Sequence, residues 1–171
     1  MFSRKIYSRW MEKNQKAKIA WILEIVQPRG RILDIGSGPG FLEESLPHAI
    51  ALDIDLENLK KIKGIKILAS GDFLPFKSGA IETVFCIDSV HLLKNAKEIE
   101  RVLQESGLAI ITAFCNEYNK QERLNSLRAL IPETLKIERE AIVRGENELD
   151  AVMICRKEKE DKTKKSISTK C

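Results

Sequence analysis

An apolar segment that runs directly into a glycine-rich turn limits this chain to few folds. Residues 32–40 read Ile-Leu-Asp-Ile-Gly-Ser-Gly-Pro-Gly, so a short buried strand is followed by glycines at every second position. Glycine lets the main chain turn sharply and approach a ligand that a side chain would exclude. A second apolar segment, residues 49–52, ends in Asp53, whose carboxylate suits the two hydroxyls of a ribose. Together these segments predict a nucleotide-type cofactor site.

The spacing of the glycines argues against a bound pyrophosphate. A dinucleotide fingerprint is Gly-x-Gly-x-x-Gly, whereas Gly36, Gly38 and Gly40 are separated by single residues. Pro39 lacks the N–H that a phosphate cradle would use. The helix expected at 41–46 has Glu43 and Glu44 in its first turn, which favour the helix dipole but repel phosphate. The ligand expected here is a nucleoside without phosphates, with a cationic group as one option.

Apolar runs alternate with helical periods along the rest of the chain. Strands are expected at 31–35, 49–53, 65–69, 83–87, 108–114, about 135–143 and about 149–155, and helices at about 9–27, 41–46, 56–63, 96–105 and 119–130. Continuous apolar runs are typical of parallel strands that are covered on both faces. Helices between such strands require right-handed crossovers, which place the ligand at the carboxyl ends of the strands, beside the first strand.

In this order, the segments resemble the motifs of class I S-adenosylmethionine-dependent methyltransferases, in particular the small, single-domain, type 11-like members. Residues 32–40 are similar to the first motif of that family, and Asp53 resembles its ribose-binding acid. Residues 74–76, Leu-Pro-Phe, resemble the end of the adenine loop before the fourth strand. Residues 101–107, Arg-Val-Leu-Gln-Glu-Ser-Gly, resemble the turn into the fifth strand. The resemblance covers about residues 20–155.

The resemblance implies an α/β fold, a Rossmann-like three-layer sandwich. Its mostly parallel seven-stranded sheet would have the order 3-2-1-4-5-7-6, with the last strand antiparallel. The implied reaction transfers a methyl group from S-adenosyl-L-methionine to an acceptor and leaves S-adenosyl-L-homocysteine. The sequence does not identify the acceptor, which is a small molecule or a translation-related macromolecule presented with a partner protein. The alternatives are a nucleotide-cofactor oxidoreductase and a non-catalytic cofactor-binding subunit of the same fold.

The cofactor site implied by the resemblance lies where several strands end. Its residues are Asp34, Gly36, Ser37, Gly38, Gly40, Asp53, Ile54, Gly71, Asp72, Phe73 and Asp88. Asp34 either meets the amino-acid portion of the cofactor or satisfies N–H groups of the loop. The adenine loop departs from the family pattern, since Ser70 falls where the adenine-binding acid sits and Asp72 follows two residues later. Asp72 is therefore either that acid or a turn residue beside Gly71.

Catalysis of this reaction requires few specific side chains. Methyl transfer from a sulfonium depends mainly on positioning and on exclusion of water, and a base is needed only where the acceptor loses a proton. Asp88 and His91 follow the fourth expected strand and are the candidate catalytic residues. A base role and a structural hydrogen bond are both open for His91. No Cys-x-x-Cys pair is present and there are only two histidines, so no metal site is predicted.

Length and charge predict the domain organisation and the compartment. One domain is expected over residues 1–156, followed by a disordered basic tail over 157–171. Residues 156–171 hold seven Lys/Arg and three Asp/Glu, so they supply the whole net charge of +4. No apolar run approaches the ~20 residues of a membrane span, and no signal core follows Met1. A cytoplasmic protein without a membrane partner is expected.

Two macromolecular partners are considered besides the acceptor. The basic side chains near the N-terminus either meet a nucleic-acid backbone or form a solvated helix face. A small zinc-ribbon activator protein, which pairs with a sheet edge in some compact methyltransferases, is the second hypothesis. Its grounds are the small size of the chain and the apolar stretch 109–114.

Overall fold

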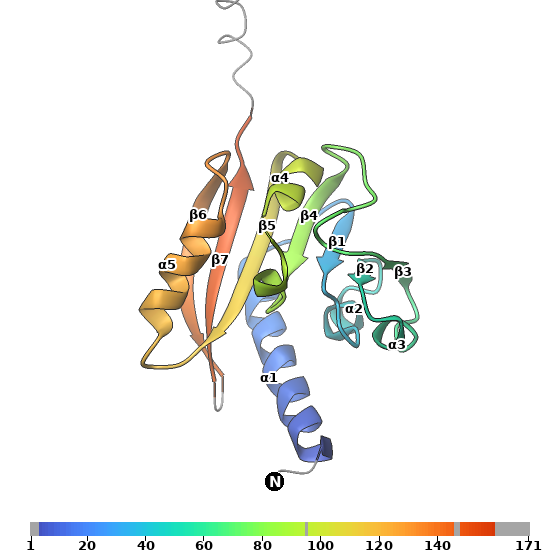
Figure 1. Ribbon diagram of the computed structural model, residues 1–171, viewed down its shortest axis with the longest axis vertical. Coiled ribbons are helices and arrows are strands. Elements are labelled where there is room, and N and C mark those ends of the chain that lie inside the picture. Colours follow the sequence, from blue (N-terminus) through green and yellow to red (C-terminus); the bar gives the residue numbers. More distant parts are fainter. Residues whose placement is uncertain (1–3, 95, 146–147, 160–171) are drawn as a thin grey trace, which may run out of the picture.

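The computed structural model of the chain describes the backbone of residues 4–94, 96–145 and 148–159, and the side chains from residue 11 onward within these ranges. A seven-stranded sheet in the order β3-β2-β1-β4-β5-β7-β6 forms its centre (Figure 1). The strands are β1 (Ile32–Ile35), β2 (Ile50–Asp53), β3 (Ile65–Leu68), β4 (Ile81–Cys86), β5 (Leu103–Cys115), β6 (Leu135–Arg144) and β7 (Leu149–Lys157). Neighbours from β3 to β5 are parallel, and β7 is antiparallel to β5 and β6. The predicted fold class and strand order are confirmed.

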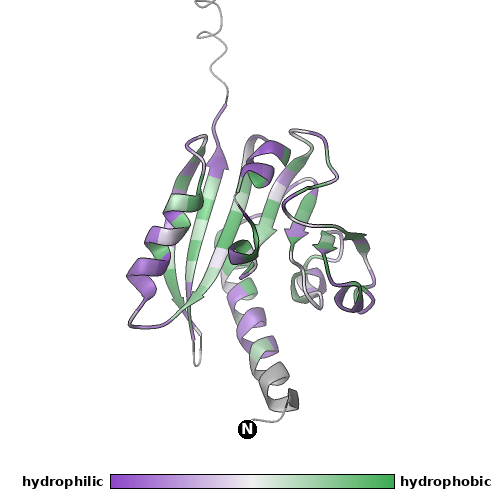
Figure 2. Cartoon of the chain, viewed as in Figure 1, coloured by the Kyte–Doolittle hydropathy of each residue, from purple (hydrophilic) through white to green (hydrophobic). Residues whose placement is uncertain are grey.

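Helices cover both faces of this sheet. They are α1 (Arg4–Ile25), α2 (Phe41–Ser45), α3 (Leu56–Leu59), α4 (Lys97–Val102) and α5 (Lys120–Leu130), with a 3₁₀ turn η1 (Val90–Leu92). On one face, Ile22 of α1 is buried in a cluster with Phe85 of β4. On the other face, Ile99 of α4 and Leu127 of α5 are buried against the sheet. The central strands are therefore covered on both sides, and Figure 2 shows them as the most hydrophobic elements.

Helix α1 extends past the carboxyl ends of β1 and β4 (Figure 1). Its polar residues therefore lie beside the loops that follow those strands. One contact fixes this arrangement, because the Gln15 side-chain amide donates a hydrogen bond of 2.6 Å to Asp88 Oδ2. A helix that mainly covers the sheet thus also contributes to the edge where the sequence predicts a ligand.

Several element boundaries differ from the prediction: α1 begins at Arg4 rather than near residue 9, and tertiary contacts account for two further differences. Helix α3 is shorter than the predicted 56–63, because Ile62 turns inward and is only 5% exposed. Strand β5 begins within the predicted helix 96–105, because Leu103 pairs with Ile81 ahead of a register shift in the ladder. In both places a tertiary contact overrides a local pattern.

The apolar stretch 109–114 does not lie at a sheet edge, so it provides no grounds for an activator contact. It belongs to β5, which pairs with β4 on one side and with β7 on the other. The outer strands are β3 and β6. On β3, Ile65 and Leu68 are 58% and 57% exposed. The exposed residues of β6 are charged, namely Lys136, Glu138, Arg139, Glu140 and Arg144.

The end of the sheet bears on the predicted domain limits. Strand β7 continues to Lys157, the first residue of the predicted tail 157–171. Residues 160–171 lie outside the described part of the chain, so the disorder predicted for them stays a prediction, as does the domain limit. Among the described helices, none combines the length and the apolar character that crossing a bilayer requires.

Candidate cofactor site

The glycine loop adopts a backbone that other residues rarely take. Gly36, Gly38 and Gly40 have φ values of 72°, 53° and 95°. The loop is fixed to the next strand, because the backbone N–H groups of Gly36 and Ser37 both donate to Leu52 O, at 2.7 and 3.1 Å. A Cβ on Gly38 would meet no atom within 4 Å. Gly38 is therefore the point of the loop at which a ligand can approach the main chain.

Asp53 holds this loop in place. Its Oδ2 accepts a hydrogen bond of 2.7 Å from Gly38 N, and its Oδ1 accepts one of 2.7 Å from Asp55 N. Each carboxylate oxygen has a further lone pair, so hydroxyl donors can still be accommodated. The loop-anchoring role was not predicted. Asp55 in turn caps the next helix, since its Oδ1 accepts a hydrogen bond from Glu57 N at the start of α3.

Two buried carboxylates lie near the glycine loop without a cationic partner among the described residues. Asp34 is 3% exposed and Glu43 is 7% exposed. Both carboxylate oxygens of Glu43, and the hydroxyl of Ser37, are buried without a hydrogen-bond partner. Burial raises the pKa of Glu43 to about 7. Burial, then the charges of Glu43 and Asp53, raises the pKa of Asp34 well above its usual range.

This set of groups fits a cationic ligand. A buried carboxylate without a partner is costly when ionised, and a cation bound nearby would relieve that cost. A pyrophosphate would instead add negative charge beside Asp34 and Glu43. In the sequence Glu43 is visible only as an acid at a helix start that repels phosphate, because its burial depends on the packing of α2. The unpartnered oxygens thus support a ligand with a cationic group.

Large apolar side chains are exposed at the same edge of the sheet. Ile54 follows β2 and is 71% exposed, and Phe73 lies in the loop after β3 and is 76% exposed. Leu92, in the turn after β4, is 68% exposed. Apolar surface around a few polar groups is typical of a small-molecule site. Ile54 and Phe73 were predicted, whereas nothing in the sequence distinguishes Leu92 from a core leucine.

The loop predicted to bind adenine, residues 70–76, is hydrogen-bonded to the loop after β4. Asp72 Oδ1 accepts a hydrogen bond of 2.8 Å from Lys94 N, and Asp72 N donates to Ser70 Oγ at 3.2 Å. Gly71 is packed so closely that an added Cβ would lie 2.6 Å from Leu93 Cδ2. Asp72 therefore has a structural role in the turn. Its predicted contact with an adenine stays a prediction.

The two candidate catalytic residues have different surroundings. Asp88 has a φ of 53°, and its Oδ1 accepts a hydrogen bond of 2.7 Å from the hydroxyl of Thr112. Its Oδ2 accepts from Gln15 at 2.6 Å and from Lys18 Nζ. His91 is exposed in η1 and forms no hydrogen bond with the described residues. The carboxylate of Asp88 is thus occupied by hydrogen bonds from other side chains. A role as catalytic base stays a prediction for both Asp88 and His91.

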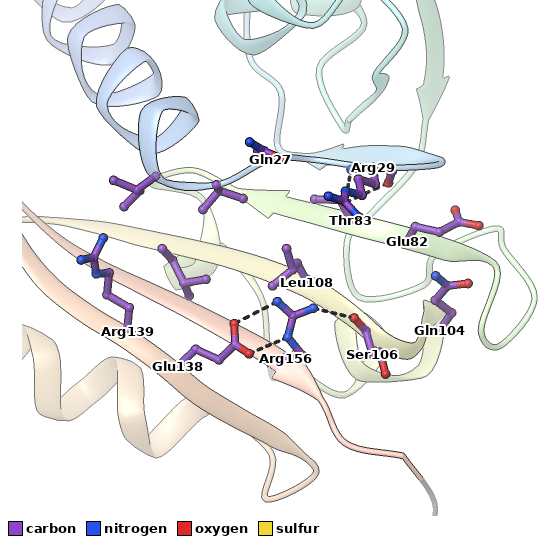
Figure 3. A pocket seen from close by; sticks show the side chains of 13 residues that line it. Gln27, Arg29, Glu82, Thr83, Gln104, Ser106, Leu108, Glu138, Arg139 and Arg156 are labelled. Atoms are coloured by element: carbon purple, nitrogen blue, oxygen red, sulfur yellow. Dashed lines mark hydrogen bonds and ion pairs between the residues drawn. The ribbon is translucent and has the colours of Figure 1, made fainter.

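A cavity of about 580 Å³ lies away from these residues, near the amino ends of β4 and β5 (Figure 3). Its lining includes Gln27, Thr83 and Gln104 and none of the predicted cofactor residues. Arg156, which also lines it, is paired with Glu138 at 2.5 Å and donates to Ser106 O at 2.9 Å. The cavity is therefore separate from the candidate cofactor site. No cluster of potential metal ligands occurs among the residues that the structure describes.

Comparison with known proteins agrees with this geometry. Residues 33–111 match the family model of a methyltransferase domain. The chain is 33% identical over 129 residues to the malonyl-[acyl-carrier protein] O-methyltransferase of Legionella pneumophila, over 65% of this chain and 43% of that protein. Overall, the chain spans about half the length of the curated relatives it matches.

Solved structures share the whole architecture. A SAM-dependent methyltransferase of Thermotoga maritima superimposes with a TM-score of 0.68 at 17% identity, covering 90% of this chain and 96% of that chain. A methyltransferase in complex with the Haloferax volcanii Trm112 activator matches with a TM-score of 0.64 at 12% identity, covering 78% and 85%. Residues 33–111 of the chain therefore match a methyltransferase domain, and its fold is that of a solved S-adenosylmethionine-dependent methyltransferase.

Proposed function

We propose that this chain binds S-adenosyl-L-methionine at the glycine loop and transfers its methyl group to an acceptor. The observation that carries the proposal is the pair Asp34 and Glu43, which are buried near the loop without a cationic partner among the described residues. S-adenosylmethionine has a sulfonium and an ammonium group and no phosphate, so its charge complements the two acids. When bound, it supplies an activated methyl group.

In this proposal each part of the site contacts one part of the ligand. Asp53 accepts from the ribose hydroxyls while it holds Gly38. Ile54 and Phe73 cover the adenine with apolar surface that is otherwise exposed, and Asp72 faces its amino group. Gly36, Ser37 and Gly40 shape the loop around the amino-acid portion. Closure of this surface around the ligand excludes water, which is the main protein contribution to methyl transfer.

Titration calorimetry tests this assignment. S-adenosylmethionine and S-adenosylhomocysteine should bind to the purified chain, and NAD should give no heat. A variant Gln104→Ala, altered only in the separate cavity, should bind both adenosyl ligands like the unchanged protein. Tight binding of NAD without binding of either adenosyl ligand would favour the oxidoreductase alternative and overturn the proposal.

A non-catalytic binding subunit is the second candidate. It is favoured by one observation, since both carboxylate oxygens of Asp88 are occupied by other side chains. The enzyme and the binding subunit are discriminated by incubating the chain with a labelled methyl donor. Small-molecule, RNA and protein fractions are added in separate reactions. Label in one fraction identifies the acceptor class, whereas binding of the donor without any transfer supports the second candidate.

An activator of the zinc-ribbon kind is proposed to pair with β3. Among the two outer strands, β3 exposes apolar side chains, Ile65 and Leu68, whereas β6 exposes charges. Pairing of a further strand would cover these side chains and satisfy the open edge. Co-expression with candidate zinc-ribbon proteins, followed by gel filtration, should give a complex that Ile65→Lys abolishes. A chain that stays soluble and monomeric in every pairing would count against the activator.

Contact with a nucleic acid and a cytoplasmic location both stay predictions.

A further inference from the structure

Lys18 of α1 is buried between two carboxylates. Its side chain is 1% exposed, and Nζ lies 2.6 Å from Asp150 Oδ1 and also contacts Asp88 Oδ2. Asp150 is 2% exposed, at the start of β7, and Asp88 follows β4. Lysine is almost never fully buried unless it is paired. One ammonium group therefore joins three elements that lie far apart in the sequence.

Stability alone is a weak reason for such a group. Removal of charges from water costs free energy, and a well-packed apolar side chain often holds a helix at least as well. The apolar residues Ile19 and Ile22 already fix α1 on the sheet. What an apolar side chain at position 18 would not provide is a directed contact with Asp88. That contact is the feature to explain.

The contact holds a strained turn. Asp88 has a φ of 53°, a conformation that costs a residue other than glycine on the order of 1–3 kcal/mol. It is retained by two hydrogen bonds with the hydroxyl of Thr112, at 2.7 and 3.0 Å, together with Gln15 and Lys18. Four bonds from two elements, α1 and β5, therefore define the path of the chain after β4.

The next residue connects this turn to the glycine loop. Ser89 Oγ donates a hydrogen bond of 2.6 Å to Ile35 O, the last residue of β1. A Cβ on Gly36 would lie only 2.5 Å from Ser89 Cβ, so Ser89 packs directly against the glycine loop at Gly36. A shift of Asp88 would move Ser89 and change the shape of the loop at Gly36.

We propose that Lys18 is a positioning residue of the cofactor site, which acts through Asp88 and Ser89 to hold the glycine loop in its ligand-binding shape. Its contact with Asp150 secures the lysine and contributes to stability alone. The inference rests on the proposed function, since it concerns affinity for the adenosyl ligand. Helix α1 thereby affects cofactor affinity from a residue that does not touch the loop.

Two variants separate positioning from stability. Lys18→Met removes both contacts, and Asp150→Asn keeps the pair between Lys18 and Asp88. Thermal unfolding and calorimetric titration with S-adenosylhomocysteine are measured on the full chain. Lys18→Met should lower the unfolding temperature, because it leaves Asp88 and Asp150 without their shared cation. Lys18→Met should weaken binding about tenfold, and Asp150→Asn by less than roughly twofold, in the range known for coupled sites.

If Lys18→Met does not fold, Asp88→Asn tests the same contact between Lys18 and Asp88. The amide keeps the shape that meets Thr112 but loses the charge pair, so it should weaken binding to a similar extent. Equal binding by Lys18→Met and the unchanged protein would overturn the inference, as would equal losses in Lys18→Met and Asp150→Asn. If the unchanged protein does not bind S-adenosylhomocysteine, the proposed function fails and the inference fails with it.

Discussion

Replacement of Glu43 by glutamine should change how stability depends on pH. The pKa of this acid rises from 4.5 to about 7 on folding, mainly through burial. Between these values the folded chain binds more protons than the unfolded chain, so its free energy of unfolding falls as pH rises. Each pH unit corresponds to ~1.4 kcal/mol, so an ionised Glu43 costs the folded state about 3 kcal/mol above about pH 8. Below about pH 4.5 the cost is absent.

Urea unfolding at about pH 5 and about pH 8 measures this difference. Asp150, whose pKa burial raises to about 6, and Glu148, whose pKa burial raises to about 7, also lower stability as pH rises. Because part of the cost of ionising Glu43 is already present at about pH 5, the loss of stability between the two pH values should shrink in Glu43→Gln by roughly 2 kcal/mol without disappearing. Burial of the glutamine amide in Glu43→Gln changes the free energy of unfolding equally at both pH values. The quantity to compare is therefore the difference in this free energy between about pH 5 and about pH 8.

Glu44→Gln is the matched control. Glu44 is the next residue, but its side chain is 58% exposed and pairs with Lys16 at 2.7 Å. Its replacement should leave the pH dependence of stability close to that of the unchanged protein. An identical pH dependence in Glu43→Gln and in the unchanged protein would show that Glu43 is solvated or paired in solution. Glu43 would then not be an unbalanced acid, and it would give no support to a cationic ligand at the loop.

Three further outcomes are expected. S-adenosylmethionine should bind more tightly at about pH 8 than at about pH 6, because the cation favours ionised Glu43, and calorimetry in buffers of different ionisation enthalpy should detect the released proton. Gly36→Ala should abolish binding and destabilise the fold by at least about 2 kcal/mol in urea unfolding, since its Cβ would lie 2.5 Å from Ser89 at a φ of 72°. Arg101→Ala should cost about 2 kcal/mol by the same measurement, because its guanidinium donates to Leu74 O and Phe76 O.

The sequence predicts those parts of the fold that depend on local patterns. Buried parallel strands are continuous apolar runs, so all seven strands were found, and the glycine loop with Asp53 follows from one motif. Where a distant contact decides, the local pattern is insufficient. The turn of Ile62 into the interior shortened α3, and pairing with Ile81 extended β5 toward its start.

The same limit applies to the site. Residues with a motif were predicted, whereas Lys18 was not, because 70 residues separate it from Asp88 and it lies in an ordinary amphipathic helix. Its burial is visible only after α1 has been placed on the sheet. Glu43 was noticed as an acid at a helix start, but its lack of a partner depends on everything packed around it.

Four acids at the carboxyl edge of the sheet form two pairs, of which one contacts a lysine and the other contacts no described cation. Asp88 and Asp150 share Lys18, so the protein itself balances part of their charge. Asp34 and Glu43 have no basic partner in the described part of the chain, and burial raises the pKa of both. If all four acids served only the fold, the second pair would be expected to have a lysine or arginine as the first has. The contrast within one edge indicates that the balancing charge near the glycine loop comes from the ligand.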